Sequence, residues 1–132
     1  CRHEILPGII AYAIAHETNG IDSSMAVSNG NFSAYHGNDN YADLSALRAL
    51  RAAIGPINVG CVPFAYIHWY PFLLDSMEET EKAREARRLI ETYLKVGMAQ
   101  AEALEAEIAV PFGANLVYFD QADSVIPISP SM

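Results

Sequence analysis

Residues 24–62 read SMAVSNGNFSAYHGNDNYADLSALRALRAAIGPINVGCV, and this stretch begins with the pattern of two paired strands. The apolar runs 24–27 and 32–36 flank the tetrad Ser28–Asn31. An Asn-Gly pair between two such runs is a strong local signal for a β-hairpin. Upstream, the apolar and partly β-branched run Ile9–His16 predicts one more strand.

A helical pattern replaces the strand pattern after Tyr41. Apolar residues then recur every three or four positions, Asp43 favours a helix N-terminus, and the Gly55-Pro56 pair stops the pattern. Residues 57–62 follow as a short apolar run, which is typical of a buried strand.

The longest predicted element is a second helix, which a capping-box pattern at Ser76–Glu79 opens. One apolar stripe continues from there to about Glu107. Its members are Ala83, Ala86, Ile90, Tyr93, Leu94, Met98, Ala101 and Leu104. Gly97 interrupts the pattern and indicates close helix packing rather than a hinge. Residues 108–111 predict a last short strand.

The order of these elements is strand, hairpin, helix, strand, long helix and strand. It predicts a single α/β (α+β) domain over residues 1–132, with residues 120–132 as a terminal arm. The strands form a mixed β-sheet with helices on one face. Because helices cover only one face, we expect the other face to be apolar and to need a partner layer.

Composition limits the function. The chain has 132 residues, is 52% hydrophobic and carries a net charge of −8 with no basic run, so a nucleic-acid partner is not expected. No apolar segment is long enough to cross a membrane, and no secretory signal pattern is present, so cytoplasmic residence is the default expectation. The start at Cys1 suggests a processed chain or a piece of a longer one. An N-terminal nucleophile at Cys1 is the other reading, although Arg2-His3-Glu4 fits it poorly.

Three stretches carry a family resemblance. They are Tyr35–Asn40, which ends the hairpin, Ile57–Ala65 followed by Tyr70–Phe72, and Val110–Asn115 after the long helix. Their order and spacing resemble the C-terminal half of the metallo-β-lactamase superfamily. The nearest branch is the one that holds lactonase-like enzymes and the β-lactamase-like domain of CMP-sialic acid hydroxylase. The resemblance covers residues 9–119.

The resemblance implies half of a four-layer αββα sandwich that has its metal site at one edge. The main ligand loop of that fold, His-x-His-x-Asp-His, lies in the first half. Histidines occur in this chain only at positions 3, 16, 36 and 68, so the loop is missing. The closing His of the family would fall near Phe112 or Gly113, and Asn58 stands where the family has Asp.

Asp39 is the one residue of this chain that the resemblance matches to a metal ligand of the family. It aligns with the metal-bridging Asp if the alignment is allowed to shift by one residue. A carboxylate held on a turn suits such a bridge. His36 would be a second metal ligand or a partner of the ligands. The residues themselves are also consistent with purely structural roles. Asp39 could form an Asx turn, and His36 could be a structural hydrogen-bonding residue.

His68, Trp69 and Tyr70 form an aromatic segment after a predicted strand. In the family such loops build the substrate cleft, so we expect these three residues to line a substrate pocket. The alternative is that the aromatic rings fill the core and the histidine has no separate role.

Two functions follow from the resemblance. The first is part of a metal-dependent hydrolase acting on a small-molecule substrate, with Zn, Mn or Fe in the complete assembly and no metal in the isolated chain. The second is a non-catalytic scaffold or binding module that has lost its metal site. Both need a partner, which is an N-terminal-half segment or chain, or a second copy of this chain.

Overall fold

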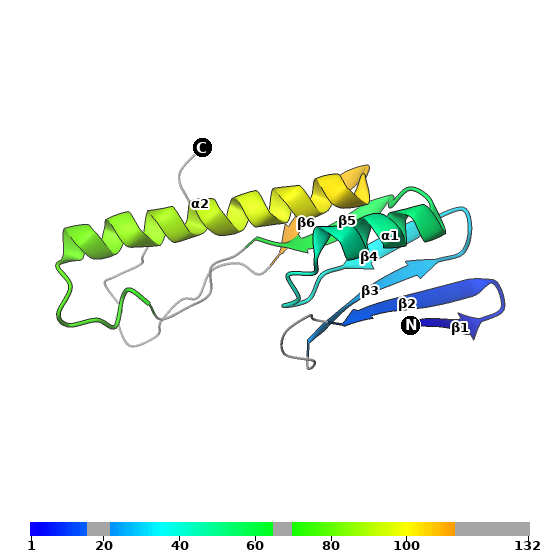
Figure 1. Cartoon of the computed structure of the whole chain (residues 1–132), viewed down its shortest axis with the longest axis horizontal. Coiled ribbons are helices and arrows are strands. Elements are labelled where there is room, and N and C mark those ends of the chain that lie inside the picture. Colours follow the sequence, from blue (N-terminus) through cyan, green and yellow to red (C-terminus); the bar gives the residue numbers. More distant parts are fainter. Residues whose placement is uncertain (16–21, 65–69, 113–132) are drawn as a thin grey trace.

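The computed structural model describes residues 1–15, 22–64 and 70–112, which form six strands and two helices. The strands are β1 (Arg2–Leu6), β2 (Ile9–Ala15), β3 (Ser23–Ser28), β4 (Ser33–His36), β5 (Val59–Pro63) and β6 (Ile108–Phe112), and the helices are α1 (Leu44–Ile54) and α2 (Glu79–Leu104). The strands lie side by side in chain order (Figure 1). Strands β1 to β4 are antiparallel, whereas β4, β5 and β6 are parallel. The predicted mixed sheet is therefore confirmed.

Local sequence signals explain the hairpin and the first helix. In the β3–β4 turn, Gly30 adopts a φ of +86°, a value that glycine reaches without strain. The Asp43 carboxylate accepts hydrogen bonds from the backbone N–H groups of Ser45 and Ala46, so it caps α1 as expected. Gly55 follows the helix with a φ of +83° and ends it.

Strand β1 was not predicted from the sequence. Its polar residues Arg2, His3 and Glu4 conceal any apolar alternation, and all five of its residues are exposed. Its pairing with β2 supplies the backbone hydrogen bonds that its side chains do not signal.

The capping-box prediction at Ser76 is wrong. Helix α2 begins at Glu79, and its N-cap Glu78 makes no side-chain capping bond. The preceding residues instead form successive turns, in which Leu74 and Met77 donate backbone N–H groups to the carbonyls of Pro71 and Leu74. The helix therefore begins two residues later than a cap at Ser76 would place it, at Glu79 instead of Met77.

The buried side of α2 differs from the predicted apolar stripe. The buried residues are Lys82, Ala86, Gly97, Gln100, Ala103 and Leu104. Three predicted members of the stripe, Ala83, Leu94 and Met98, are exposed. Gly97 faces β5, and a Cβ at this position would lie 2.8 Å from the Pro63 carbonyl oxygen. Only glycine allows the helix backbone to come so close to the strand, so the side of α2 that carries Gly97 is the buried one. The prediction that Gly97 marks close packing is confirmed.

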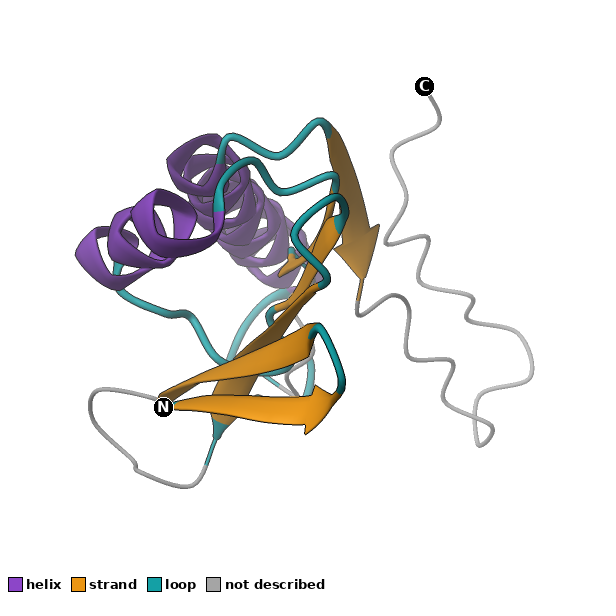
Figure 2. Cartoon of the chain, turned by 90° about the vertical axis from the view of Figure 1, so that its right-hand side faces the viewer, coloured by secondary structure: helices purple, strands orange, loops and turns teal. Residues whose placement is uncertain are grey.

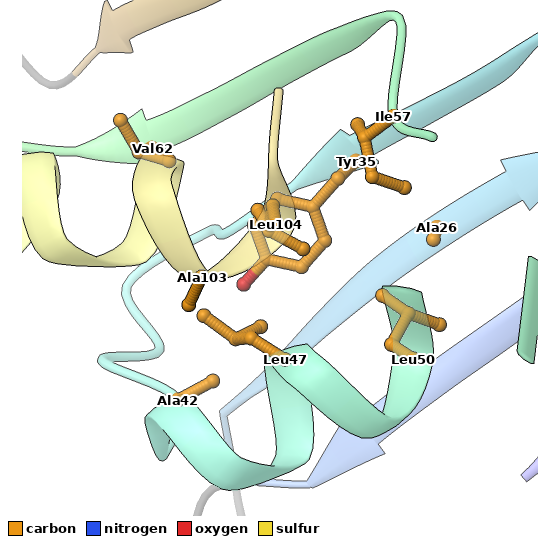
Figure 3. Close-up of a cluster of buried hydrophobic side chains, with 9 residues drawn as sticks. All are labelled: Ala26, Tyr35, Ala42, Leu47, Leu50, Ile57, Val62, Ala103 and Leu104. Atoms are coloured by element: carbon orange, nitrogen blue, oxygen red, sulfur yellow. The ribbon is translucent and has the colours of Figure 1, made fainter. Parts of the chain in front are cut away.

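The core lies between the helices and one face of the sheet. Figure 3 shows Tyr35 of β4 reaching toward Leu47 of α1 and Ala103 of α2. Leu104, also from α2, is fully buried in the same cluster. Burial of these side chains holds α1 and α2 against the central strands.

Both helices cover the same face of the sheet (Figure 2). On the opposite face the strand register places a continuous set of mostly apolar side chains, which we call the open face. Its members are Ala11, Ala13, Met25, Val27, Ala34, His36, Val59, Cys61, Ile108, Val110 and Phe112. Ile108 is 59% exposed, Met25 50% and Val110 39%, so a large apolar surface meets solvent. In the described part of the chain, neither helix has the length and apolarity to cross a bilayer.

Candidate functional site

The turn that connects β4 to α1 holds the two predicted ligand residues. It lies at the carboxyl end of a parallel strand, where ligand sites of α/β sheets are commonly found. The backbone N–H of Gly37 donates to the Cys61 carbonyl at 2.8 Å, which extends the pairing of β4 with β5 into the turn. The N–H of Asn40 donates to the Gly37 carbonyl at 3.2 Å and closes the turn.

Asn40 anchors the other end of this turn. Its side chain is fully buried, and its Nδ2 donates to the Ile14 carbonyl at 3.1 Å and to the Ser24 hydroxyl at 3.2 Å. The turn is thereby tied to β2 and β3 as well as to β5. Sequence reasoning missed Asn40, because a buried amide inside a polar Asn-Asp-Asn run has no signal that separates it from its exposed neighbours.

Asp39 lies between these two anchors and is exposed. Its carboxylate therefore projects from a backbone that is held on both sides. Tyr41 follows Asp39 by two residues. Its ring packs edge-on against Tyr93 of α2, with 5.4 Å between the ring centroids. Burial raises the pKa of Tyr41 to about 12, and Tyr93 and the Asp39 charge add to this rise. The Tyr41 phenol is thus neutral at physiological pH.

His36 ends β4 on the open face. Its Nδ1 accepts a hydrogen bond from the backbone N–H of Asn38 at 3.1 Å. Its ring packs on Phe112 of β6, with 4.6 Å between centroids and a tilt of 38°. Phe112 is one of the two positions, with Gly113, near which the resemblance places the closing His, and its ring contacts the His36 ring.

A complete metal site needs three or four protein ligands. Within residues 1–15, 22–64 and 70–112, no three His, Cys, Asp or Glu side chains come together as a metal-binding group. The structure does bring Asp39 and His36 to one turn. These two residues alone do not fit a metal, so any metal would need ligands from elsewhere.

The predicted pocket segment is only partly described. His68 and Trp69 lie outside the described residues, and Tyr70 is exposed. The Tyr70 hydroxyl donates to the Glu85 carboxylate of α2 at 3.3 Å. Arg88 also binds Glu85 and lowers the pKa of that carboxyl below its ordinary value. Pocket lining by this segment stays a prediction.

Comparison with known proteins supports the fold. No family model matches the sequence, and a search of curated proteins finds no match. A solved structure described as a mutant of CmlA beta-hydroxylase matches with a TM-score of 0.51 and 12% sequence identity. The match covers 80% of this chain and 23% of that chain.

This likeness shows the fold class. The chain has the mixed sheet and two helices of half a metallo-β-lactamase-like fold, as the sequence predicted. The chain spans less than a quarter of the matched structure.

Proposed function

We propose that this chain is part of a metal-dependent hydrolase of the metallo-β-lactamase superfamily that acts on a small-molecule substrate. In this proposal Asp39 is the metal-bridging carboxylate, and another segment supplies the histidine ligands. The observation that carries the proposal is the exposed Asp39 on a turn anchored through Gly37 and Asn40. With histidine ligands from that other segment, Asp39 would help to hold a divalent Zn, Mn or Fe ion, which would supply Lewis-acid chemistry for hydrolysis.

We also propose that an N-terminal-half segment covers the open face. The support for this proposal is the apolar character of the face and its continuity across β2 to β6. Two sheets that pack face to face bury such surfaces against each other. The same arrangement would bring the histidine ligands of the N-terminal-half segment to the edge of the sheet where Asp39 lies.

Asp39→Ala tests the metal role in the assembled protein. We expect the loss of bound metal and of turnover, because a bridging carboxylate has no substitute on this turn. With metal removed from both proteins, the free energy of unfolding should change by only about 1 kcal/mol or less, since the side chain is exposed. Elemental analysis, a turnover assay and denaturant unfolding measure the three effects.

Asp43→Ala is the matched control. This carboxylate lies four residues away and caps α1. Its loss should cost about 1 kcal/mol of stability and leave metal content unchanged. Full metal content and full activity in the Asp39→Ala protein would refute the metal role.

Met25→Lys tests the open face. A lysine there would place a charge inside the proposed sheet-to-sheet contact, where desolvation is costly. We expect at least a tenfold weaker association with the N-terminal half, measured by light scattering or calorimetry, since about 1.4 kcal/mol is tenfold. Met98→Lys on α2 is the control, because Met98 is 55% exposed against 50% for Met25 but lies off the open face. Equal association of both variants, or an isolated chain that is monomeric and binds no hydrophobic dye, would contradict the proposal.

A scaffold or binding module without metal is the second candidate. The packing of Phe112 on His36 supports it, because the resemblance places the closing histidine near Phe112 or Gly113, and Phe112 makes an aromatic contact instead of binding a metal. Under this reading Asp39→Ala changes stability slightly and alters no activity.

A further inference from the structure

His36 is the one imidazole of the described turn, and its ring nitrogens have unequal surroundings. Nδ1 meets the backbone N–H of Asn38 at 3.1 Å. Asn38 has a φ of +53°, in the left-handed region that asparagine tolerates better than most residues. This conformation belongs to the same anchored turn as Asp39, so the contact does not depend on a loose side chain.

An amide N–H only donates, so Nδ1 must be the acceptor. A neutral imidazole has one donor and one acceptor nitrogen, which places its proton on Nε2. Metal-bound histidines normally show the opposite arrangement, because the nitrogen away from the metal donates its N–H to a carboxylate or carbonyl. At His36 the nitrogen that would lie away from a metal at Nε2 is Nδ1, and it faces the N–H donor of Asn38. A metal at Nε2 would have to displace a proton that the Asn38 contact keeps there.

We propose that His36 presents an Nε2–H donor, and not a metal-binding lone pair, at the end of β4, three residues before Asp39. It is a specificity residue for an oxygen acceptor of the ligand, such as a carboxylate, phosphoryl or carbonyl oxygen. This inference rests on the proposed function for its ligand, but the proton position is a property of this chain. The Phe112 ring, 4.6 Å away, holds the imidazole in place for that role.

The test is the tautomer of His36, measured by long-range ¹H–¹⁵N NMR on the assembled protein at alkaline pH, where an imidazole is neutral. We expect a protonated Nε2 and an unprotonated Nδ1 in the metal-free protein, with the same pattern after addition of zinc chloride. A proton on Nδ1, or loss of the Nε2 proton when zinc binds, would overturn the assignment.

Two amide variants give a second readout. His36→Gln keeps an N–H donor near the Nε2 position, whereas His36→Asn places its amide near Nδ1. We expect both variants to retain zinc, and only His36→Gln to retain affinity for the substrate or for inorganic phosphate as a probe. Loss of zinc from both variants would make His36 a ligand and refute the donor role.

The outcomes separate this inference from the proposed function. If Asp39→Ala leaves metal content unchanged while His36 remains protonated at Nε2, the metal role of Asp39 fails and the donor assignment stands. If Nε2 loses its proton on zinc binding, the donor assignment fails and the metal site stands.

Discussion

Gly37→Ala is expected to destabilise the protein by about 3 kcal/mol, the upper part of the range for overpacking a tight site. A Cβ at this position would lie 2.6 Å from Cδ of Pro63 and 3.3 Å from the Cys61 carbonyl oxygen. The Pro63 ring is rigid and buried, so it cannot swing away as a flexible side chain would. The turn that carries Asp39 would have to move away from β5. Denaturant unfolding measures the loss.

Gly60→Ala is the matched control for this prediction. Gly60 is also buried and lies in β5, but a Cβ there would have the Ala106 methyl as its nearest neighbour, at 3.1 Å. That contact can relax by a few tenths of an ångström, so we expect a cost of about 1 kcal/mol. Adding Pro63→Ala should restore part of the loss in the Gly37→Ala background, as a positive coupling in a double-mutant cycle. A Gly37→Ala protein as stable as the parent would show that the backbone at Gly37 does not pack against the Pro63 ring as closely as the structure places it.

Gly97→Ala is the second large effect, with an expected loss of about 2 kcal/mol. Alanine favours a helix over glycine by about 1 kcal/mol, so the substitution would stabilise an isolated α2. In the folded protein its Cβ would lie 2.8 Å from the Pro63 carbonyl oxygen and 3.3 Å from Cβ of Phe64. A backbone carbonyl in a paired strand cannot yield, so α2 must shift outward and lose contacts with the core.

Val96→Ala is the neighbouring control on the same helix. Val96 is 37% exposed, so its shortening should change stability by less than about 0.5 kcal/mol. A Gly97→Ala protein that is more stable than the parent would mean that helix propensity outweighs the contact with β5. Thermal and denaturant unfolding of both variants measure the change in stability. A loss for Gly97→Ala alone indicates the contact with β5, and a gain indicates helix propensity.

Part of the candidate site was visible in the sequence and part was not. Asp39 and His36 became candidates through the resemblance of their turn to the metallo-β-lactamase superfamily, and the structure places His36 at the end of β4 and Asp39 in the turn that follows. The roles of Asn40 and Phe112 could not be predicted, because each depends on partners that are distant along the chain.

Local pattern was enough for most elements of the fold. The Asn-Gly turn, the cap at Asp43 and the apolar run before Pro63 act over a few residues. Within the described residues, each predicted strand and helix formed near its expected place, whereas the predicted terminal arm, residues 120–132, lies outside them. Their signals are local because turn geometry and helix capping depend on adjacent backbone groups.

Tertiary structure alone decided the features that join distant segments. Strand β1 forms because β2 offers it backbone partners, and the buried side of α2 is set by how closely Gly97 approaches Pro63. The His36 ring is held between Asn38 and Phe112, which are 74 positions apart in a chain where no short motif links them. Such contacts depend on three-dimensional distance and on the shape of neighbouring groups, and neither is encoded in the spacing of residues along the chain.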